Sequence, residues 1–415
     1  MPEQIATKEN VTVAVVGGGT AGLALASELM RLKVGKVVVL EREAEAGGVP
    51  RHCGHYPFGL REYARLMKGP DYAKRNREAA AALGVDIRTG TTVTKLHPGG
   101  ELGLSASAGT TTLSADRVVL CTGVRESSRA ERFIGGDRPD GIVSTGALQS
   151  MVYLEGIRPF RQPIILGSEL VSFSAIQTCQ HLGIRPVAMI EEMDRLIARR
   201  PLGLYLLVKS MPLYTGITNP RIIGRERVEA MNFIDRTGQA KRIAADGVIV
   251  SGRFRPESAL MRDGHLEVDP GTGGPVIDQF GRCSDPAYFA AGNLLRPAET
   301  SGFCRQEGIE TARRVAHDLE RGSTVDQGVV RIRTADPALR FVVPQRIDLS
   351  GATGGMTHLY LGLNGPVRGT MAATAGAETL WKGRLNTQPV RRTRIPLDGI
   401  VRAAPAQDVV VGRRA

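Results

Sequence analysis

The N-terminal part of the chain alternates apolar runs with one helical pattern. Residues 11–16 (VTVAVV) are mostly apolar and β-branched, which is typical of a strand buried in a parallel sheet. GGGTAG follows, and LALASELMRLKVG then has helical spacing, with Gly35 as the expected C-cap. A second apolar run, KVVVLE, ends at Glu41. This order predicts a complete β-α-β unit.

Later segments predict a meander of strands and then a second, similar unit. A helix is expected over 71–83, and strands near 102–106, 110–114 and 117–121. The order of strand, glycine, helix, strand and acid returns in PIILGSELVSFSAIQTCQHLGIRPVAMIEE, about 150 residues downstream. Further strands are expected over 221–250, and a long helix is expected after CSDPAYFAAGN. The pattern near the C-terminus predicts mainly β-strands.

These elements predict three domains. Residues 1–145 and 246–325 form a discontinuous dinucleotide-binding domain, and residues 146–245 form a second, degenerate one. Residues 326–415 form a small, basic, β-rich C-terminal domain. The predicted fold class is therefore α/β, with two Rossmann-like domains and a β-rich addition.

Composition narrows the class of protein. With 42% apolar and 23% charged residues and no run of about 18 apolar residues, the chain is expected to be globular, without a membrane span. The polar N-terminus leaves no room for a secretory signal, so a cytoplasmic location is expected, with membrane association only through partners. Five widely spaced cysteines, none in a Cys-x-x-Cys pair, argue against structural disulfides and against a metal site within the chain.

The net charge of +12 is concentrated near the C-terminus. From Arg331 onward there are 13 Lys or Arg and 5 Asp or Glu, a net charge of +8. Such a tail attracts nucleic acid, anionic lipid or an acidic partner, or is a solvated surface. No nucleic-acid-binding motif accompanies the charge, so nucleic acid is not expected as a partner.

The strongest chemical signal is the glycine turn after the first strand. Gly17 permits the tight turn, Gly19 lets the backbone approach a pyrophosphate, and Gly22 lets helix and strand pack closely. Thr20 and Ala21 lie between them, where a helix N-terminus offers N–H groups and a positive dipole end. These five residues are expected to bind the ADP half of a dinucleotide.

Glu41 and Arg42 follow the second strand. A carboxylate at this place accepts hydrogen bonds from ribose hydroxyls and disfavours a 2′-phosphate. Arg42 is expected to stack on the adenine, and the alternative is a solvated strand end.

Two later segments favour FAD over NAD at this turn. VLCTG ends in Thr122 and Gly123 and fits a strand end of FAD-dependent reductases. YFAAGN places Gly292 and Asn293 where a final acid usually holds the ribityl chain, and Asn can also bond a hydroxyl. A helix beginning near Gln306 would aim its N-terminus at the flavin.

The loop that follows Glu41 carries the candidate catalytic residues. His52, Cys53 and His55 are candidates for proton transfer, thiol chemistry or flavin contact, and the alternative is loop packing. A metal site would need further ligands, and a disulfide reductase would need a second nearby cysteine. Three more residues are expected to contact FAD: Gly48, Arg51 and Val93.

The second glycine turn is incomplete. Gly167 is retained, but Glu169 places a negative charge where a pyrophosphate would lie, and Glu191 stands at the position of a ribose-binding acid. The segment is either a modified site for NAD, ATP or ADP, or a relic kept for packing and subunit contacts. Efficient use of NAD(P)H is not expected.

Four segments carry a family resemblance: GGVPRHCGHYPFGLREYARLMKGPDYAKR, GALQSMVYL, ILGSELVSFSA and CSDPAYFAAGNLLRP. Over about residues 10–320 the chain resembles the FAD/NAD(P)-binding oxidoreductases grouped with two-component amine dehydrogenases. This group includes the flavoprotein subunit of opine oxidases, the α subunit of D-hydroxyproline and dye-linked proline dehydrogenases, and the B subunit of hydrogen cyanide synthase. The resemblance implies a fold of the pyridine nucleotide-disulfide oxidoreductase type.

The resemblance also implies a division of labour. In such complexes a second flavoprotein subunit oxidises the substrate, while the subunit resembling this chain holds FAD and passes electrons onward. Many relatives carry a cysteine cluster for a [2Fe-2S] centre, which this sequence lacks. Either a small separate iron–sulfur subunit supplies the cluster, or electrons take another route.

We therefore expect an FAD-binding, electron-transferring subunit of a hetero-oligomeric dehydrogenase or oxidase. Its substrate would be an amino acid, an opine or a similar small molecule. The alternatives are a free-standing NAD(P)H-dependent flavin oxidoreductase and a non-catalytic nucleotide-binding assembly subunit.

Overall fold

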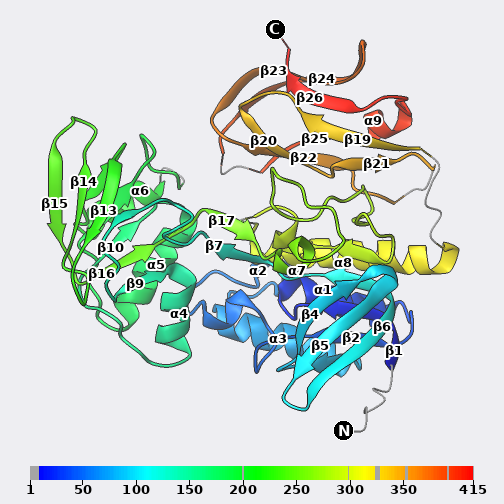
Figure 1. Ribbon diagram of the computed structural model, residues 1–415, viewed down its shortest axis with the longest axis horizontal. Helices are drawn as coiled ribbons and strands as arrows, with labels where there is room; N and C mark the ends of the chain where they lie inside the picture. Colours follow the sequence, from blue (N-terminus) through cyan, green and yellow to red (C-terminus); the bar gives the residue numbers. More distant parts are fainter. Residues whose placement is uncertain are drawn as a thin grey trace. The chain divides into compact units, whose positions relative to one another are not determined.

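The chain divides into two compact units (Figure 1). The computed structural model describes residues 9–198, 201–297, 299–322, 328–350, 354–389 and 392–414. Unit 1 comprises Met1–Gly48, Ala73–Val124 and Pro256–Ala415, and unit 2 comprises Val49–Tyr72 and Arg125–Arg255. The segment 146–245, predicted as the second domain, lies inside unit 2, which also takes in the loop from 49 to 72 and residues 125–145.

A mainly parallel sheet forms the centre of unit 1. Its strand order is β3-β2-β1-β6-β5-β4, with β18 also paired to β6. The strands are β1 (Glu9–Val16), β2 (Val37–Leu40), β3 (Asp86–Arg88), β4 (Thr92–His97), β5 (Glu101–Ala106), β6 (Gly109–Leu120) and β18 (Tyr288–Ala290). The predicted strands at 110–114 and 117–121 are a single strand, because β5 pairs with the first half of β6 while β18 pairs with its last residues.

Helix α1 (Thr20–Arg31) ends earlier than predicted. Leu32 is its C-cap, and Lys33 takes the left-handed conformation (φ 57°) for which Gly35 was expected. Gly35 (φ 117°) has a different role, since a Cβ there would lie 2.3 Å from the Thr12 Oγ1 atom. The glycine therefore lets the loop pass β1 closely.

The longest helix of unit 1 packs against α1. It is α8 (Ser301–Arg321), and a Cβ on Gly308 would lie only 2.3 Å from the Ala21 carbonyl oxygen, so the two helices are in close contact. The other helical segments in or bordering unit 1 are α3 (Gly69–Ala82), η2 (Pro98–Gly100), α7 (Ala259–Arg262), η3 (Gly292–Leu294) and α9 (Asp398–Arg402).

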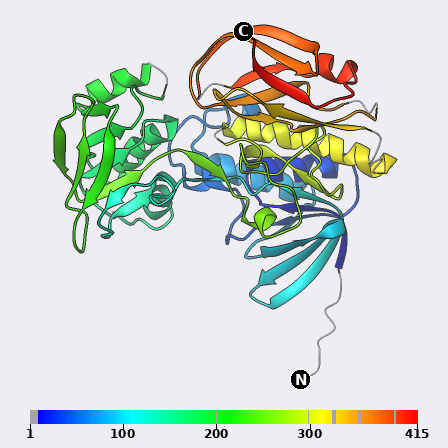
Figure 2. The same ribbon diagram turned by 45° about the horizontal axis from the view of Figure 1, so that its top comes forward.

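The C-terminal region is β-rich, as predicted. One sheet has the order β21-β19-β26-β23-β24 and another the order β20-β22-β25. The strands are β19 (Val329–Thr334), β20 (Leu339–Val343), β21 (Arg346–Asp348), β22 (His358–Leu363), β23 (Val367–Ala375), β24 (Glu378–Thr387), β25 (Thr393–Pro396) and β26 (Val409–Arg413). They lie next to α8 in both views (Figures 1 and 2). Ile347 and Val409 share one hydrophobic core with Val11 and Ala14 of β1, so these strands belong to unit 1.

Unit 2 repeats the strand–glycine–helix–strand order. Its parallel sheet has the order β12-β11-β10-β16-β9, and α5 (Leu170–His181) follows β10. The strands are β9 (Ile142–Ser144), β10 (Pro163–Leu166), β11 (Ala188–Glu191), β12 (Leu213–Thr215) and β16 (Gly247–Val250). A second sheet contains β8 (Gly135–Gly136), β13 (Thr218–Ile223), β14 (Ala230–Ile234) and β15 (Ala240–Ala244).

The remaining elements of unit 2 are short. They are η1 (Val49–His52), α2 (Leu60–Tyr63), α4 (Thr145–Tyr153) and α6 (Pro201–Val208). A two-stranded pair, β7 (Val124–Glu126) and β17 (Phe254–Pro256), stands where the chain passes between the units. Among the described residues, no helix has both the length and the apolar character needed to cross a membrane.

Candidate functional site

The first glycine turn (Gly17–Gly22) connects β1 to α1. Gly17 has φ 105°, and a Cβ there would lie 2.6 Å from the Cys121 carbonyl oxygen. A Cβ on Gly22 would lie 2.0 Å from the Gly17 carbonyl oxygen. The packing of the chain itself therefore excludes a side chain at both positions.

Gly19 differs from these two glycines. Its backbone is extended (φ −78°, ψ −171°), a conformation open to any residue. A Cβ on Gly19 would approach only the Gly48 Cα, at 3.8 Å. The protein leaves space in front of Gly19 that a side chain would fill, as a site for a closely approaching ligand requires.

The N-terminus of α1 is open to an anion. No described side chain caps it, and its first turn carries no acid. By contrast, the Ser144 hydroxyl caps α4 by accepting a hydrogen bond from the Ala147 N–H at 3.2 Å. The N–H groups at Thr20 and Ala21 have no carbonyl partner within their own helix, so the pyrophosphate of a dinucleotide fits here.

Glu41 connects the second strand to this turn. Its Oε2 accepts the Gly18 N–H at 2.9 Å, and its Oε1 accepts the Glu43 N–H at 3.0 Å. The residue is buried, so the carboxylate is held beside the turn, where ribose hydroxyls of a bound nucleotide would lie. Arg42 forms an exposed ion pair with Glu43 at 3.4 Å, and its stacking on an adenine stays a prediction.

The segment YFAAGN (288–293) reaches the first glycine turn. Gly292 has φ 79°, and a Cβ there would lie 2.8 Å from the Ala21 Cβ. Gly123 also takes a left-handed φ, 75°, and the neighbouring Thr122 hydroxyl donates to the Glu257 carbonyl at 2.7 Å. The structure thus brings Gly292 against α1, as is required if YFAAGN and the first glycine turn are to contact the same FAD.

The side chain of Asn293 forms its hydrogen bonds with the loop before α8. Its Oδ1 accepts the Glu299 N–H at 2.8 Å, and its Nδ2 donates to the Glu299 carbonyl at 3.2 Å. A carboxylate could make only the first of these bonds, which explains why an amide stands here. The expected ribityl contact stays a prediction.

The prediction of a helix beginning near Gln306 was wrong. Helix α8 begins at Ser301 after the extended N-cap Thr300, so Gln306 lies in its second turn. The Gln306 side chain donates to Glu310 at 3.1 Å on the surface. Cys304, in the first turn of α8, is buried.

Sequence reasoning missed Glu307 and Arg296. The Oε2 of Glu307 accepts the Gly292 N–H at 2.9 Å, and its Oε1 lies 2.6 Å from Nη2 of Arg296. The Arg296 guanidinium is buried and stacks on the Tyr360 ring, 4.1 Å from its centroid. Glu307 therefore ties α8 to the Gly292 turn. The signal in the sequence was an acid three residues after Cys304, about one helical turn further on, and directly before Gly308.

The candidate catalytic residues lie in unit 2. Cys53 is buried and donates to the Gln149 side-chain oxygen at 3.5 Å. Burial raises the pKa of its thiol to about 12, with a further contribution from the Glu126 carboxylate. A thiol of this kind is not a nucleophile at neutral pH, so the structure argues against redox chemistry at Cys53.

The neighbouring loop residues are partly exposed. His52 ends η1, directly after Arg51, and both are half-buried. His55 Nδ1 lies 3.0 Å from the Tyr56 carbonyl, and its ring packs 5.6 Å from the Phe58 ring. Arg51, His52 and His55 thus keep their roles as predictions, because the first glycine turn belongs to the other unit.

Gly48 and Val93 belong to unit 1. A Cβ on Gly48 (φ 63°) would lie 2.8 Å from the Gly19 Cα, so Gly48 closes one side of the space at the first glycine turn. Val93 is buried in the hydrophobic core, so a contact with a cofactor would have to come from its backbone.

The second glycine turn (Gly167–Ser172) has the same backbone arrangement as the first. Gly167 has φ 123°, and a Cβ there would lie 2.3 Å from the Ser251 carbonyl oxygen. The Ser168 hydroxyl and the Met193 N–H donate to Glu191 at 2.6 and 2.9 Å. Glu191 is therefore fixed at the end of β11 much as Glu41 is fixed after β2.

Glu169 stands where the first turn has Gly19. As the N-cap of α5, it accepts the Arg253 N–H through Oε1 at 2.8 Å. A Cβ on Gly252 would lie 2.7 Å from the Glu169 carboxyl carbon, so the side chain fills this corner of the site. Burial raises the pKa of Glu169.

Two arginines near Glu169, both among the described residues, are already paired. Arg132 and Arg253 both reach the Glu192 carboxylate, at 3.0 and 2.6 Å. A pyrophosphate at the second glycine turn would therefore meet the Glu169 carboxylate without an uncommitted arginine from this pair. The side chain that fills this corner, together with its like charge when ionised, argues against a pyrophosphate here, and weak NAD(P) binding stays a prediction.

The cysteines offer no cluster site. All five are unpaired and buried. Within the described ranges, no three side chains from His, Cys, Asp and Glu converge as metal ligands would.

Comparison with known proteins agrees with this geometry. A family model described as pyridine nucleotide-disulphide oxidoreductase matches residues 11–317. The chain belongs to this family. It is therefore a flavin-dependent oxidoreductase with Rossmann-like domains, and binding of FAD and of NAD(P) is typical of the family.

Two curated relatives are reductases. The ferredoxin–NAD(+) reductase component of 3-phenylpropionate/cinnamic acid dioxygenase from Photorhabdus laumondii is 26% identical over 74% of this chain and 76% of the relative. The probable ferredoxin reductase CtmF from Castellaniella defragrans is 26% identical over 69% of this chain and 68% of the relative.

Two solved structures share the fold. Thioredoxin reductase from T. acidophilum superposes with a TM-score of 0.62 at 22% identity, over 75% of this chain and 99% of that one. L-proline dehydrogenase from P. horikoshii gives a TM-score of 0.55 at 18% identity, over 76% of this chain and 57% of that one. At these identities the likeness is one of fold.

Proposed function

We propose that the chain is the FAD-binding, electron-transferring subunit of a multi-subunit dehydrogenase or oxidase. One contrast within the chain supports this most strongly. The first glycine turn leaves space in front of Gly19, whereas the second holds the Glu169 carboxylate in the corresponding place. A protein built this way keeps FAD and takes its electrons from a source other than NAD(P)H.

The residues of unit 1 have distinct tasks toward FAD. The N–H groups at the start of α1 hold the pyrophosphate, and the Glu41 carboxylate orients the ribose. Gly48 keeps the approach to Gly19 free of a side chain, and Gly292 leaves the space beside Ala21 free. When bound, FAD supplies a redox centre that accepts two electrons and passes them on.

The electron partners are proteins. A second flavoprotein subunit oxidises the substrate, and a small iron–sulfur protein receives or relays the electrons. Two observations support the iron–sulfur partner. Two of the curated relatives are named as ferredoxin reductases, and the five buried cysteines of this chain are dispersed. A cluster would therefore come from another chain.

The substrate class follows from the resemblance of the sequence to opine oxidase and proline dehydrogenase subunits. We assign an amino acid, an opine or a similar small molecule as the substrate of the whole complex.

A free-standing NAD(P)H-dependent flavin oxidoreductase is the second candidate. The relative from Photorhabdus laumondii, named as a ferredoxin–NAD(+) reductase component, favours it. Glu169 at the second glycine turn opposes it. The two candidates differ in the source of electrons.

Affinity purification of the tagged chain from its native host tests the first proposal. The expected result is co-purification of a second flavin-containing polypeptide, with substrate-dependent dye reduction by the complex. A matched Gly19→Val variant should recover the partner with less flavin. A chain that purifies alone and shows full activity by itself would overturn the proposal.

A further inference from the structure

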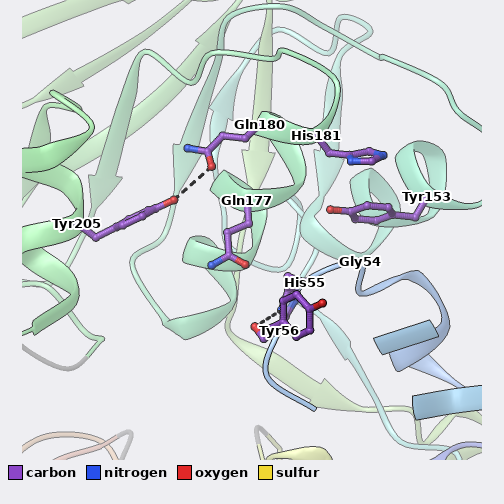
Figure 3. Close-up of a pocket in the computed structure, with 8 residues that line it drawn as sticks. All are labelled: Gly54, His55, Tyr56, Tyr153, Gln177, Gln180, His181 and Tyr205. Atoms are coloured by element: carbon purple, nitrogen blue, oxygen red, sulfur yellow. Dashed lines mark hydrogen bonds between the residues drawn. The ribbon is translucent and has the colours of Figure 1, made fainter. Parts of the chain in front are cut away.

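A pocket of about 510 Å³ opens on unit 2 (Figure 3). It lies away from the second glycine turn. The turn lies at the N-terminal end of α5, whereas Gln177, Gln180 and His181 line the pocket at the C-terminal end. The 12 residues of α5 span about 18 Å, so the two places are separate. The volume is within the range of small-molecule sites.

Aromatic rings form the walls of this pocket. The Tyr153 ring packs on the backbone of Gly54, where a Cβ would lie 2.1 Å from a ring carbon, and 5.0 Å from the His181 ring. Tyr205 stands on the other side, with the glutamines of α5 between (Figure 3). These contacts hold the rings in place before any ligand arrives.

Two amides face the space between the rings. Gln177 and Gln180 are three residues apart on α5 and so share one face of the helix. Gln180 accepts a hydrogen bond from the Tyr205 hydroxyl at 3.4 Å, which leaves its NH₂ group available. The side chain of Gln177 is exposed and has no hydrogen bond to another residue of the described chain. Such amides can both donate to and accept from the edge of a heterocycle.

The charge of the side chains that line the pocket narrows the class of ligand further. Among the described residues that line it there is no Asp, Glu, Lys or Arg. Apart from His55 and His181, the lining offers no side chain that ionises near neutral pH as a counter-ion, which favours an uncharged group of the ligand inside it. Lys209 lies beside the pocket, with its Nζ 5.7 Å from the centroid of the Tyr205 ring, and offers a cation to a phosphate outside.

We propose that this pocket binds the base of a purine nucleotide. The base stacks against Tyr205, the amide of Gln177 bonds its edge, and the phosphate points toward Lys209. Stacking on aromatic side chains and amide contacts to an adenine edge are established modes of base recognition. The site is independent of the electron-transfer role proposed above.

Equilibrium dialysis of the FAD-loaded chain with adenosine and with AMP tests this site. Both probes should bind, and Gln177→Ala and Tyr205→Leu should weaken both by about 10-fold or more. Lys209→Gln should weaken AMP and leave adenosine unchanged. Gln239→Ala, an exposed glutamine of the same unit, is the matched control and should change nothing.

Two results would overturn the assignment. One is the absence of adenosine binding at millimolar concentration. The other is binding that survives Gln177→Ala but changes with Glu169→Gln, which would place the base at the second glycine turn. Because Gln177 is exposed, its variant should fold even if the Tyr205 variant does not. Co-purification of partner subunits is unaffected by either result.

Discussion

The Glu169 carboxylate accepts a hydrogen bond from the backbone N–H of Arg253 at 2.8 Å. This bond holds an acid at the position where a dinucleotide-binding turn needs room for a pyrophosphate. Gly167 and Glu191 keep their expected places around it, so the second turn retains its architecture while its phosphate position is filled.

Removing this carboxylate should admit NADH. We expect Glu169→Gly to tighten NADH binding by about 10-fold or more, since it removes both the like charge and the side chain that fills the corner. Glu169→Gln, which keeps the volume without the charge, should give an intermediate gain. Calorimetric titration measures both, and equal affinities in all three proteins would contradict the interpretation.

Gly19 and Gly22 should respond differently to substitution. Gly19→Val should fold normally, because a Cβ there meets only the Gly48 Cα at 3.8 Å, but should lower FAD affinity by about 100-fold. Gly22→Ala should destabilise the fold by about 1–3 kcal/mol, because its Cβ would lie 2.0 Å from the Gly17 carbonyl oxygen. Thermal unfolding and flavin content after dialysis separate the two effects. A Gly19→Val protein that retains FAD would argue against a pyrophosphate at this turn.

Cys53 should be inert. Burial raises its pKa to about 12, so at pH 8 only about one thiol in ten thousand is ionised. The direction of the shift keeps the thiol neutral as pH rises through 9, and Cys53 should contribute no pH dependence to activity between pH 6 and 9. A thiol reagent should titrate less than about one equivalent in the folded protein and all five cysteines after unfolding. Rapid stoichiometric reaction of Cys53 in the folded state would refute this.

Asn293→Asp should weaken the protein although an acid is usual at this place in FAD-dependent reductases. The carboxylate loses the bond that Nδ2 donates to the Glu299 carbonyl, and a loss of about 1 kcal/mol of stability is expected. Comparison of unfolding midpoints and FAD affinities checks this, with Asn386→Asp on β24 as an exposed control. Tighter FAD binding by Asn293→Asp would show that the ribityl contact outweighs the loop bonds.

The local features of the fold were predictable because neighbouring residues determine them. A β-branched run, a glycine turn and an amphipathic pattern occupy about 30 consecutive residues, so β1, α1 and Glu41 followed from spacing alone. The same holds for the second turn, where Gly167, Glu169 and Glu191 have the expected order.

Features that depend on distant partners were not predictable. Asn293 stands in place of the usual acid because of Glu299, and α8 begins at Ser301 because its first turn packs in the folded chain. Glu307 acquires its role only when α8 lies beside the Gly292 turn. The loop from 49 to 72 joins unit 2 through tertiary contacts that its glycines and prolines do not encode.

Anaerobic mixing of the FAD-loaded protein with NADH and with NADPH measures the electron source directly. If Glu169 excludes the dinucleotide, the flavin absorbance should stay that of the oxidised cofactor for minutes, while dithionite bleaches it at once. Rapid bleaching by either nucleotide would contradict the proposed function and identify the chain as an NAD(P)H-dependent reductase.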